Sequence, residues 1–237
     1  DSKKIQVEFV SANPTGPLHV GHGRGAIYGD VISRLLEKKG HEVQKEYYVN
    51  DAGRQIDILT ASVYLRAIDI EDNIFPESAY RGKYIKEIAK NANLQEAVNI
   101  DDLFKGLPES DEEKIDKIIS HLKSASEKDW QSIKKVSLEN VLSTIEKDLE
   151  DFGVTFDNWF LESSLLGADS KIDAAVQQLS TNNLIDNRDG NIWFKSSDFG
   201  DDKDRVLIRA DGRQTYFASD VAYHKDKLDR GFDEIIN

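Results

Sequence analysis

The sequence contains no cysteine, no methionine and only four prolines among its 237 residues. Without cysteine there is no disulfide framework and no thiolate zinc site, so the cytoplasm is the default expectation for its location. Methionine is missing even at position 1. We therefore expect the chain to be a fragment of a longer protein.

Long apolar runs are also missing. No stretch approaches the roughly 18 consecutive apolar residues of a membrane-spanning helix, and the start, DSKKIQVEFV, lacks the apolar segment of a signal peptide. The net charge of −13 argues against broad electrostatic binding of nucleic acid, although it allows a local basic patch. Hydrophobic residues make up 39% of the chain, which is enough for a packed core. We expect a globular protein without a membrane partner.

The first fifty residues carry the pattern of a strand, a helix and a second strand. Residues 5–10 alternate apolar and polar side chains, as a half-buried strand does. From Gly25 onward apolar residues recur at helical spacing, and Gly40 occupies the position of a C-terminal glycine cap. Residues 41–50 indicate a second strand. A strand–helix–strand unit predicts a parallel sheet.

The remaining chain changes character twice. For about a hundred residues after Arg54 it is charged, with helical apolar stripes over 115–122 and 138–149 that indicate packing rather than chemistry. Residues 154–161 then resemble a strand. We expect Ser170 to cap a helix, because an acidic residue follows three positions later.

The last sixty residues favour hairpins and one more helix. Asp189-Gly190 and Asp211-Gly212 are typical hairpin turns between β-forming segments. A helix is predicted from roughly residue 220 to 228. Residues 233–237 look like the start of another strand, which suggests an incomplete sheet.

The segment between the first strand and the first helix, SANPTGPLHVGHGRG over residues 11–25, contains His19 and His22 on either side of Gly21. Two histidines three apart could face one metal ion, but zinc needs about four ligands and no third histidine or cysteine lies nearby. The glycine spacing does not match a dinucleotide fingerprint. A purely structural loop would explain the glycines but not the imidazoles.

Nucleotide activation accounts for every residue type in this loop. A helix N-terminus offers free N–H groups and positive potential to a phosphate, and imidazoles there can donate hydrogen bonds as charge builds in the transition state. Gly21 has no Cβ, so adenine could lie against the backbone. Since no covalent nucleophile is present, the loop fits a transfer driven by positioning and charge stabilisation.

The pattern His19-Val-Gly-His22 resembles the "HIGH" signature of class I aminoacyl-tRNA synthetases. Residues 7–25 and 47–56 resemble bacterial arginyl-tRNA synthetases nearly letter for letter, and residues 216–225 match a third block of that family. Three long blocks in the right order are specific, whereas the histidine pair alone also occurs in other nucleotidyltransferases.

The resemblance implies an α/β chain with a Rossmann-type parallel sheet, a HUP-like nucleotide-binding fold. A mostly helical insertion and a small β-hairpin insertion interrupt it. The implied domains are 1–60, the first half of the catalytic domain; 61–130, the helical insertion; 131–165, the return to the catalytic domain; 166–212, the second insertion; and 213–237, the continuation.

The resemblance also implies an arginine-tRNA ligase. It would condense L-arginine with ATP, accompanied by Mg²⁺ and with no tightly bound metal, and pass the arginyl group to tRNA(Arg). The family's lysine-containing loop and anticodon-binding domain are not found in the sequence. We therefore expect a catalytic-domain fragment that is inactive alone, from a cytoplasmic protein that is a monomer at full length.

Particular residues inherit roles from the matched blocks. His19, Gly21 and His22 would bind ATP, with the two histidines as the catalytic pair. The implied arginine-binding residues are Glu8, Ser11, Asn13, His22, Tyr216 and Asp220. The chemistry agrees, because a guanidinium needs carboxylates placed in its plane, and ligands of parallel sheets bind beyond the carboxyl ends of the strands.

From the residues alone, most of these positions can also be explained by a purely structural role. Glu8 could be a solvated strand residue, Tyr216 a core residue and Asp220 a helix N-cap. Asn13 could serve only as a turn residue before proline, with Ser11 capping the same loop.

Two other functions stay open. The histidine loop could belong to a small-molecule nucleotidyltransferase without an arginine pocket, or the chain could be a non-catalytic, synthetase-like binding module. Binding of arginine but not of lysine would separate the first alternative from a ligase.

Overall fold

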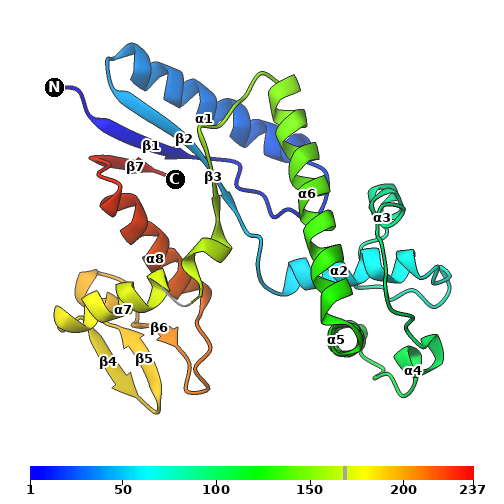
Figure 1. Cartoon of the computed structure of the whole chain (residues 1–237). Coiled ribbons are helices and arrows are strands. Elements are labelled where there is room, and N and C mark those ends of the chain that lie inside the picture. The colour runs from blue at the N-terminus through cyan, green and yellow to red at the C-terminus, as the bar shows by residue number, and fades with distance from the viewer. Residues whose placement is uncertain (168–169) are drawn as a thin grey trace. The chain divides into compact units, whose positions relative to one another are not determined.

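The computed structural model describes residues 1–167 and 170–237 (Figure 1). Residues 168 and 169, which fall in the expected second insertion, lie outside the described residues. The elements are, in order, β1 Lys4–Glu8, α1 Val20–Lys38, β2 Glu42–Val49, α2 Arg54–Ala67, α3 Lys83–Ala89, α4 Ile100–Phe104, α5 Asp111–Ala125, α6 Glu127–Asp151, β3 Asn158–Leu161, η1 Glu162–Leu165, α7 Lys171–Thr181, β4 Ile185–Arg188, β5 Asn191–Phe194, η2 Ser196–Phe199, β6 Arg205–Ile208, α8 Tyr216–Asp229 and β7 Glu234–Ile236.

The chain divides into two compact units. The first unit holds both sheets with α7 and α8, and it comprises Asp1–Ser11, Arg24–Val49 and Phe156–Asn237. The second unit holds the histidine loop and the helices α2–α6, and it comprises Ala12–Gly23 and Asn50–Thr155. The domain boundaries expected from the sequence stay a prediction.

A four-stranded sheet in the order β3-β2-β1-β7 organises the first unit. All three pairings are parallel, with Ile5 opposite both Val43 and Glu234, and Tyr47 opposite Trp159. The predicted strand–helix–strand unit and the parallel sheet are confirmed. The short strand predicted at the end of the chain is also present, as β7 beside β1.

Helix α1 is confirmed, and its last turn closes as the sequence indicated. Gly40 has a φ of 91°, which a glycine adopts without strain. Gly29 lies so close to the Phe9 ring that a Cβ there would be 2.1 Å from its Cγ. The larger apolar side chains Tyr28 and Leu35, by contrast, are 71% and 60% exposed.

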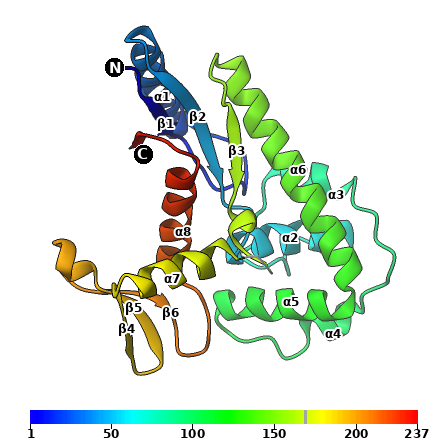
Figure 2. The same ribbon diagram turned by 60° about the vertical axis from the view of Figure 1, so that its left-hand side comes forward.

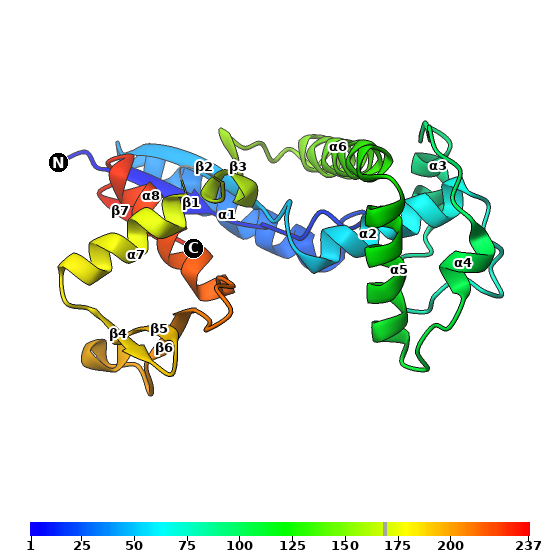
Figure 3. The ribbon, with the colours of Figure 1, turned by 60° about the horizontal axis from the view of Figure 1, so that its bottom comes forward.

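The first unit also contains the predicted hairpin at Asp189-Gly190, whereas Asp211 and Gly212 lie in a turn after β6 that is closed by a bridge between Ile208 and Gln214. Strands β4, β5 and β6 form an antiparallel sheet, and Asp189 and Gly190 join β4 to β5 with φ angles of 51° and 76°. Positive φ at both turn residues matches the right-handed twist of the strands. Figure 2 shows α7 and α8 side by side, and Figure 3 shows the hairpin sheet next to them.

Capping residues set where α7 and α8 begin. Ser170 caps α7 as predicted, since its Oγ accepts the N–H of Asp173 at 3.1 Å. Helix α8 starts at Tyr216, four residues before the predicted start, because Thr215 Oγ1 accepts the N–H of Ala218 at 3.3 Å. Asp220 therefore lies in the second turn of α8, and its reading as an N-cap is wrong.

The second unit is helical, as its apolar stripes predicted. Ile115, Ile118 and Leu122 of α5 are fully buried, and Trp130 of α6 is 1% exposed. Helix α2 packs against α6, and α5 crosses it (Figure 3). Among the described residues, no helix is long and apolar enough to cross a membrane.

Candidate active site

The two histidines of the loop cap helix α1 reciprocally. The Nδ1 of His19 accepts the N–H of Gly21 at 3.1 Å, and the Nδ1 of His22 accepts the N–H of His19 at 3.2 Å. The arrangement is close to a capping box, with imidazoles in place of the usual hydroxyl and carboxylate, except that His19 accepts the N–H of the second helical residue instead of the third. The rings stack with their centroids 3.8 Å apart.

These caps fix the proton positions on the imidazoles. Because both Nδ1 atoms accept hydrogen bonds, each neutral ring carries its proton on Nε2, where it can be donated to a ligand. Burial lowers the pKa of His22 below its ordinary value, and the charge of His19 adds to this effect. In the neutral form of each ring, the Nε2–H groups are donors at a helix N-terminus, an arrangement that suits phosphate oxygens.

Gly21 leaves room for the His19 ring in its capping position. A Cβ on Gly21 would lie 2.8 Å from the Cε1 of His19, so any larger residue would push that ring off the turn. The adenine-binding role assigned to Gly21 stays a prediction.

The rest of the loop lies against side chains of the second unit. The Tyr84 hydroxyl donates to the carbonyl oxygen of Thr15 at 2.6 Å, and the Asn13 amide donates to Gln55 Oε1 at 2.7 Å. These side chains border a cavity of about 470 Å³ that includes both imidazoles in its lining. Helices outside the loop thus hold the conformation of the loop.

In the first unit, Glu8 is the last residue of β1, and a lysine of α8 neutralises its charge. The Lys227 ammonium lies 2.7 Å from Glu8 Oε2, and the Ser11 hydroxyl donates to Glu8 Oε1 at 3.0 Å. Ser11 Oγ also accepts the N–H of Tyr48 at 3.1 Å. The Lys227 side chain is fully buried and that of Glu8 is 15% exposed. Glu8 is therefore an anchored carboxylate, and its reading as a solvated strand residue is wrong.

Further carboxylates surround Tyr48 at the end of β2. Burial raises the pKa of Tyr48, and the charge of Glu162, to which its hydroxyl is hydrogen-bonded, raises it further. The charges of Asp220 and Glu8 act in the same direction. The charges of three acidic side chains thus act on one tyrosine, and carboxylates are the groups that bind a guanidinium.

Asp220 and Tyr216 share one face of α8, four residues apart. Burial raises the pKa of Asp220, with a further contribution from the charge of Glu8, while His224 and Lys227 act against it. Tyr216 is 72% exposed, so its reading as a core residue is wrong.

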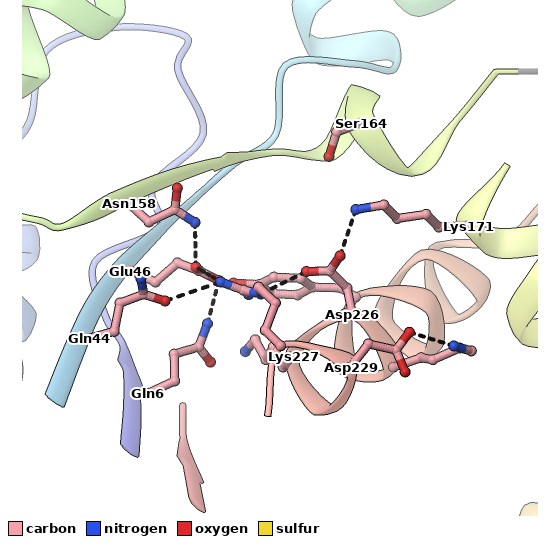
Figure 4. A network of polar contacts seen from close by, with 12 residues as sticks. Gln6, Gln44, Glu46, Asn158, Ser164, Lys171, Asp226, Lys227 and Asp229 are labelled. Carbon is pink, nitrogen blue, oxygen red and sulfur yellow. Dashed lines mark hydrogen bonds and ion pairs between the residues drawn. The ribbon is translucent and has the colours of Figure 1, made fainter. Parts of the chain in front are cut away.

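A buried polar network fastens α8 to the sheet (Figure 4). The Glu46 carboxylate is fully buried and accepts two hydrogen bonds from Arg230, at 2.6 and 2.8 Å. It also accepts hydrogen bonds from the Tyr223 hydroxyl at 2.6 Å, from Asn158 at 2.5 Å, and from Gln6. Burial alone would raise the pKa of Glu46, but the hydrogen bonds from Arg230, Tyr223 and Asn158, together with the charge of Arg230, lower it overall.

The predicted site residues thus form two groups, one in each unit. Glu8, Ser11, Tyr216 and Asp220 belong to the first unit, and Asn13, His19, Gly21 and His22 belong to the second. Their roles toward ATP and arginine stay predictions.

Sequence reasoning missed Glu162, Tyr48 and Lys227. Glu162 follows β3 directly, at the carboxyl end of a parallel strand, and that position was a usable signal. Tyr48 lay within a matched block but was read only as part of a strand. For Lys227 there was no signal, because lysine is almost never fully buried.

Comparison with known proteins identifies the family of this chain. A family model described as "tRNA synthetases class I (R), catalytic domain" matches residues 1–237. Arginine–tRNA ligases of Psychrobacter cryohalolentis and Acinetobacter baumannii are 46% and 45% identical to it over alignments of 260 and 264 residues. Both alignments cover 100% of this chain, which spans 42% and 43% of the relatives' lengths.

Solved structures agree. A Campylobacter jejuni chain assigned as an arginyl-tRNA synthetase has a TM-score of 0.78 and 37% identity, and the match covers 100% of this chain and 47% of that one. The arginyl-tRNA synthetase of Thermus thermophilus has a TM-score of 0.65 at 22% identity, covering 94% of this chain and 36% of that chain, and shows the fold alone. Since the family model matches the whole sequence, the chain belongs to the class I tRNA synthetases (R), as a catalytic domain.

Proposed function

We propose that the chain supplies part of the active site of an arginine–tRNA ligase, which activates L-arginine with ATP and transfers it to tRNA(Arg). The observation that carries the proposal is the Glu8 carboxylate at the end of β1, held by Lys227 and Ser11, with the charges of Glu8, Asp220 and Glu162 all acting on Tyr48. Planar, permanently charged guanidinium groups bind best where several carboxylates can take their five N–H donors. The family and the relatives' name give the reaction class.

The chemistry assigned to the histidine loop is charge stabilisation. The carboxylate of arginine attacks the α-phosphorus of ATP, the bond to the β-phosphate oxygen breaks, and pyrophosphate leaves with the electron pair. The Nε2–H groups of His19 and His22 would donate to phosphate oxygens as negative charge builds on them. A hydroxyl of the terminal ribose of tRNA then attacks the carbonyl carbon of the arginyl-adenylate, and AMP leaves.

Mg²⁺ would arrive bound to the phosphates of ATP. Within residues 1–167 and 170–237, no three His, Cys, Asp or Glu side chains form a cluster that could hold a metal ion. Mg²⁺ is commonly held by substrate phosphates with one or two carboxylates. A cytoplasmic location and a monomeric full-length protein belong to the same proposal.

Isothermal titration of this chain with arginine tests the substrate. We expect arginine to bind and lysine not to bind, because an ammonium cannot reproduce the planar set of donors. Asp220→Asn should weaken arginine binding about tenfold or more, the effect of losing a charged hydrogen-bond acceptor. Asp229→Asn, an exposed change on the same helix, is the matched control and should leave the affinity unchanged.

Equal binding of lysine and arginine, or no binding of either, would contradict the proposal. Absence of arginine binding together with binding of ATP would favour the alternative of a small-molecule nucleotidyltransferase.

A further inference from the structure

Two carboxylates lie side by side on the parallel sheet, at the face that helix α8 covers. Glu8 of β1 is the register partner of Glu46 of β2, and residues of α8 contact both side chains. Like charges at neighbouring positions of a sheet repel each other. The repulsion is stronger here than at a surface, because Glu46 is fully buried. The two carboxylates therefore need partners that balance them and keep them apart.

Helix α8 and its C-cap residue supply one cation to each carboxylate. The Lys227 ammonium lies 2.7 Å from Glu8 Oε2. Arg230 donates to both oxygens of Glu46, at 2.6 and 2.8 Å. Two negative charges of the sheet thus meet two positive charges that come from one segment of the chain.

Tyr223, one turn before Lys227 on α8, contacts both ion pairs. Its hydroxyl donates to Glu46 Oε1 at 2.6 Å, and the Lys227 ammonium lies over its ring, 4.1 Å from the centroid. Burial raises the pKa of Tyr223, and the negative charges of Glu8 and Glu46 raise it further, so the hydroxyl stays protonated. A single side chain therefore links the Glu8 pair with the Glu46 pair.

The Tyr223 ring is held by aromatic neighbours as well. Its centroid lies 4.7 Å from that of Tyr48 and 4.6 Å from that of Phe160, and the residue is 3% exposed. Offset and tilted ring pairs at these distances are favourable. Because the ring is packed in this way, the direction of its hydroxyl toward the carboxylates is fixed before any substrate arrives.

Glu8 keeps acceptor capacity for a ligand in this arrangement. Ser11 and Lys227 each take one hydrogen bond from it, whereas an ionised carboxylate can accept about four. Its side chain is 15% exposed, so a substrate can reach it. The orientation of Glu8 then decides how well a bound arginine can use the remaining lone pairs.

We propose that Tyr223 is a positioning residue for the arginine substrate. Its hydroxyl holds the Glu46 carboxylate away from Glu8, and its ring supports the ammonium of Lys227. Glu8 thereby keeps the orientation in which it accepts hydrogen bonds from arginine. The inference rests on the proposed function and deepens it, because it assigns the substrate site a residue that does not touch the substrate.

Isothermal titration of this chain with arginine tests the proposal. Tyr223→Phe keeps the ring and removes only the hydroxyl, and it should weaken arginine binding about tenfold, the effect of losing one hydrogen bond to a charged group. Tyr64→Phe is the matched control. The Tyr64 hydroxyl is also buried but has no hydrogen-bond partner among the described residues, so its loss should leave the affinity unchanged.

A second substitution separates positioning from a merely structural role. In Tyr223→Phe/Glu46→Gln the charge that would displace Glu8 is gone, so most of the lost affinity for arginine should return. Urea unfolding should show the same double variant to be less stable than Tyr223→Phe, because Arg230 has lost its bidentate carboxylate partner. If Tyr223 served only stability, the double variant would bind arginine more weakly still.

The positioning role is overturned if Tyr223→Phe binds arginine as tightly as the unmodified chain, or if the double variant binds no better than Tyr223→Phe. Asp220→Asn is titrated in the same series. Weaker binding in Asp220→Asn but not in Tyr223→Phe would leave the proposed function standing and remove only the role of Tyr223. Absence of arginine binding by the unmodified chain would remove both.

A measurement on the unmodified chain covers the case in which Tyr223→Phe does not fold. The chain is labelled with ¹³C at the tyrosine Cζ atoms and titrated with arginine and with lysine. The Tyr223 signal should move when arginine is added and stay in place with lysine. A Tyr223 signal that does not respond to bound arginine would also overturn the proposal.

Discussion

The ammonium group of Lys227 lies 2.7 Å from the Glu8 carboxylate, and the lysine side chain is completely buried. Asn237 gives the ammonium a second acceptor at 2.8 Å. The charge of Glu8 is therefore already balanced by the protein. The contacts with Lys227 and Ser11 hold Glu8 in one orientation.

Replacing Lys227 by methionine should reduce the free energy of unfolding by about 3 kcal/mol or more, because it leaves the Glu8 carboxylate without its counter-ion. Urea unfolding of this chain measures the loss. The double variant Glu8→Gln/Lys227→Met should regain much of it, since no unpaired charge remains. Simple addition of the two single effects would show that the groups do not interact.

Glu46 should make stability depend on pH. Its hydrogen bonds lower its pKa below the ordinary 4.5, so the folded state binds fewer protons than the unfolded state near that pH. The contribution of Glu46 is therefore complete above pH 4.5 and is lost as the pH falls through the folded-state pKa. Glu46→Gln should cost about 3 kcal/mol at pH 7.

Urea unfolding of the unmodified chain and of Glu46→Gln at several pH values checks this dependence. The difference between the two proteins should shrink as the pH falls below 4.5. A difference that stays constant down to pH 3 would rule out the assignment of the titration to Glu46.

Two glycines of α1 should respond in opposite directions to alanine. At Gly29 a new Cβ would meet the Phe9 ring at 2.1 to 2.5 Å, so Gly29→Ala should destabilise the chain by about 1–3 kcal/mol. At Gly25 nothing lies within 4 Å, and Gly25→Ala should stabilise it by about 0.5–1 kcal/mol through helix propensity. Thermal unfolding of the two variants measures both effects, and equal shifts would contradict the packing at Phe9.

Local signals account for the parts of the fold that the sequence predicted. The glycine cap at Gly40, the serine cap at Ser170 and the Asp189-Gly190 turn depend on neighbouring residues only, and the structure contains all three. The start of α8 was predicted four residues late, because the apolar spacing was read without the cap at Thr215.

The site was less predictable because its contacts are long-range. The matched blocks indicated Glu8 and Asp220, but no local pattern shows that Lys227, 219 residues away along the chain, neutralises Glu8. Glu46 sits in a strand of alternating pattern, and only the assembled sheet shows that Arg230 and Asn158 satisfy its charge. The reciprocal histidine caps also needed coordinates, since imidazoles are not usual capping residues.

His22 should titrate at a lower pH than an ordinary histidine. Burial and the neighbouring His19 lower the pKa of His22 below 6.5, so two-dimensional NMR of the imidazole signals should show His22 still neutral at pH 6.5. The unfolded state binds the proton more readily, so the free energy of unfolding should fall as the pH drops through 6.5 toward the folded-state value. His19→Ala should raise the pKa of His22 part of the way back to 6.5. The substitution removes the repulsion between the two imidazoles, but the burial of His22 remains. Titration of His22 at or above 6.5 in the unmodified chain would contradict the lowering of its pKa by burial and by the charge of His19.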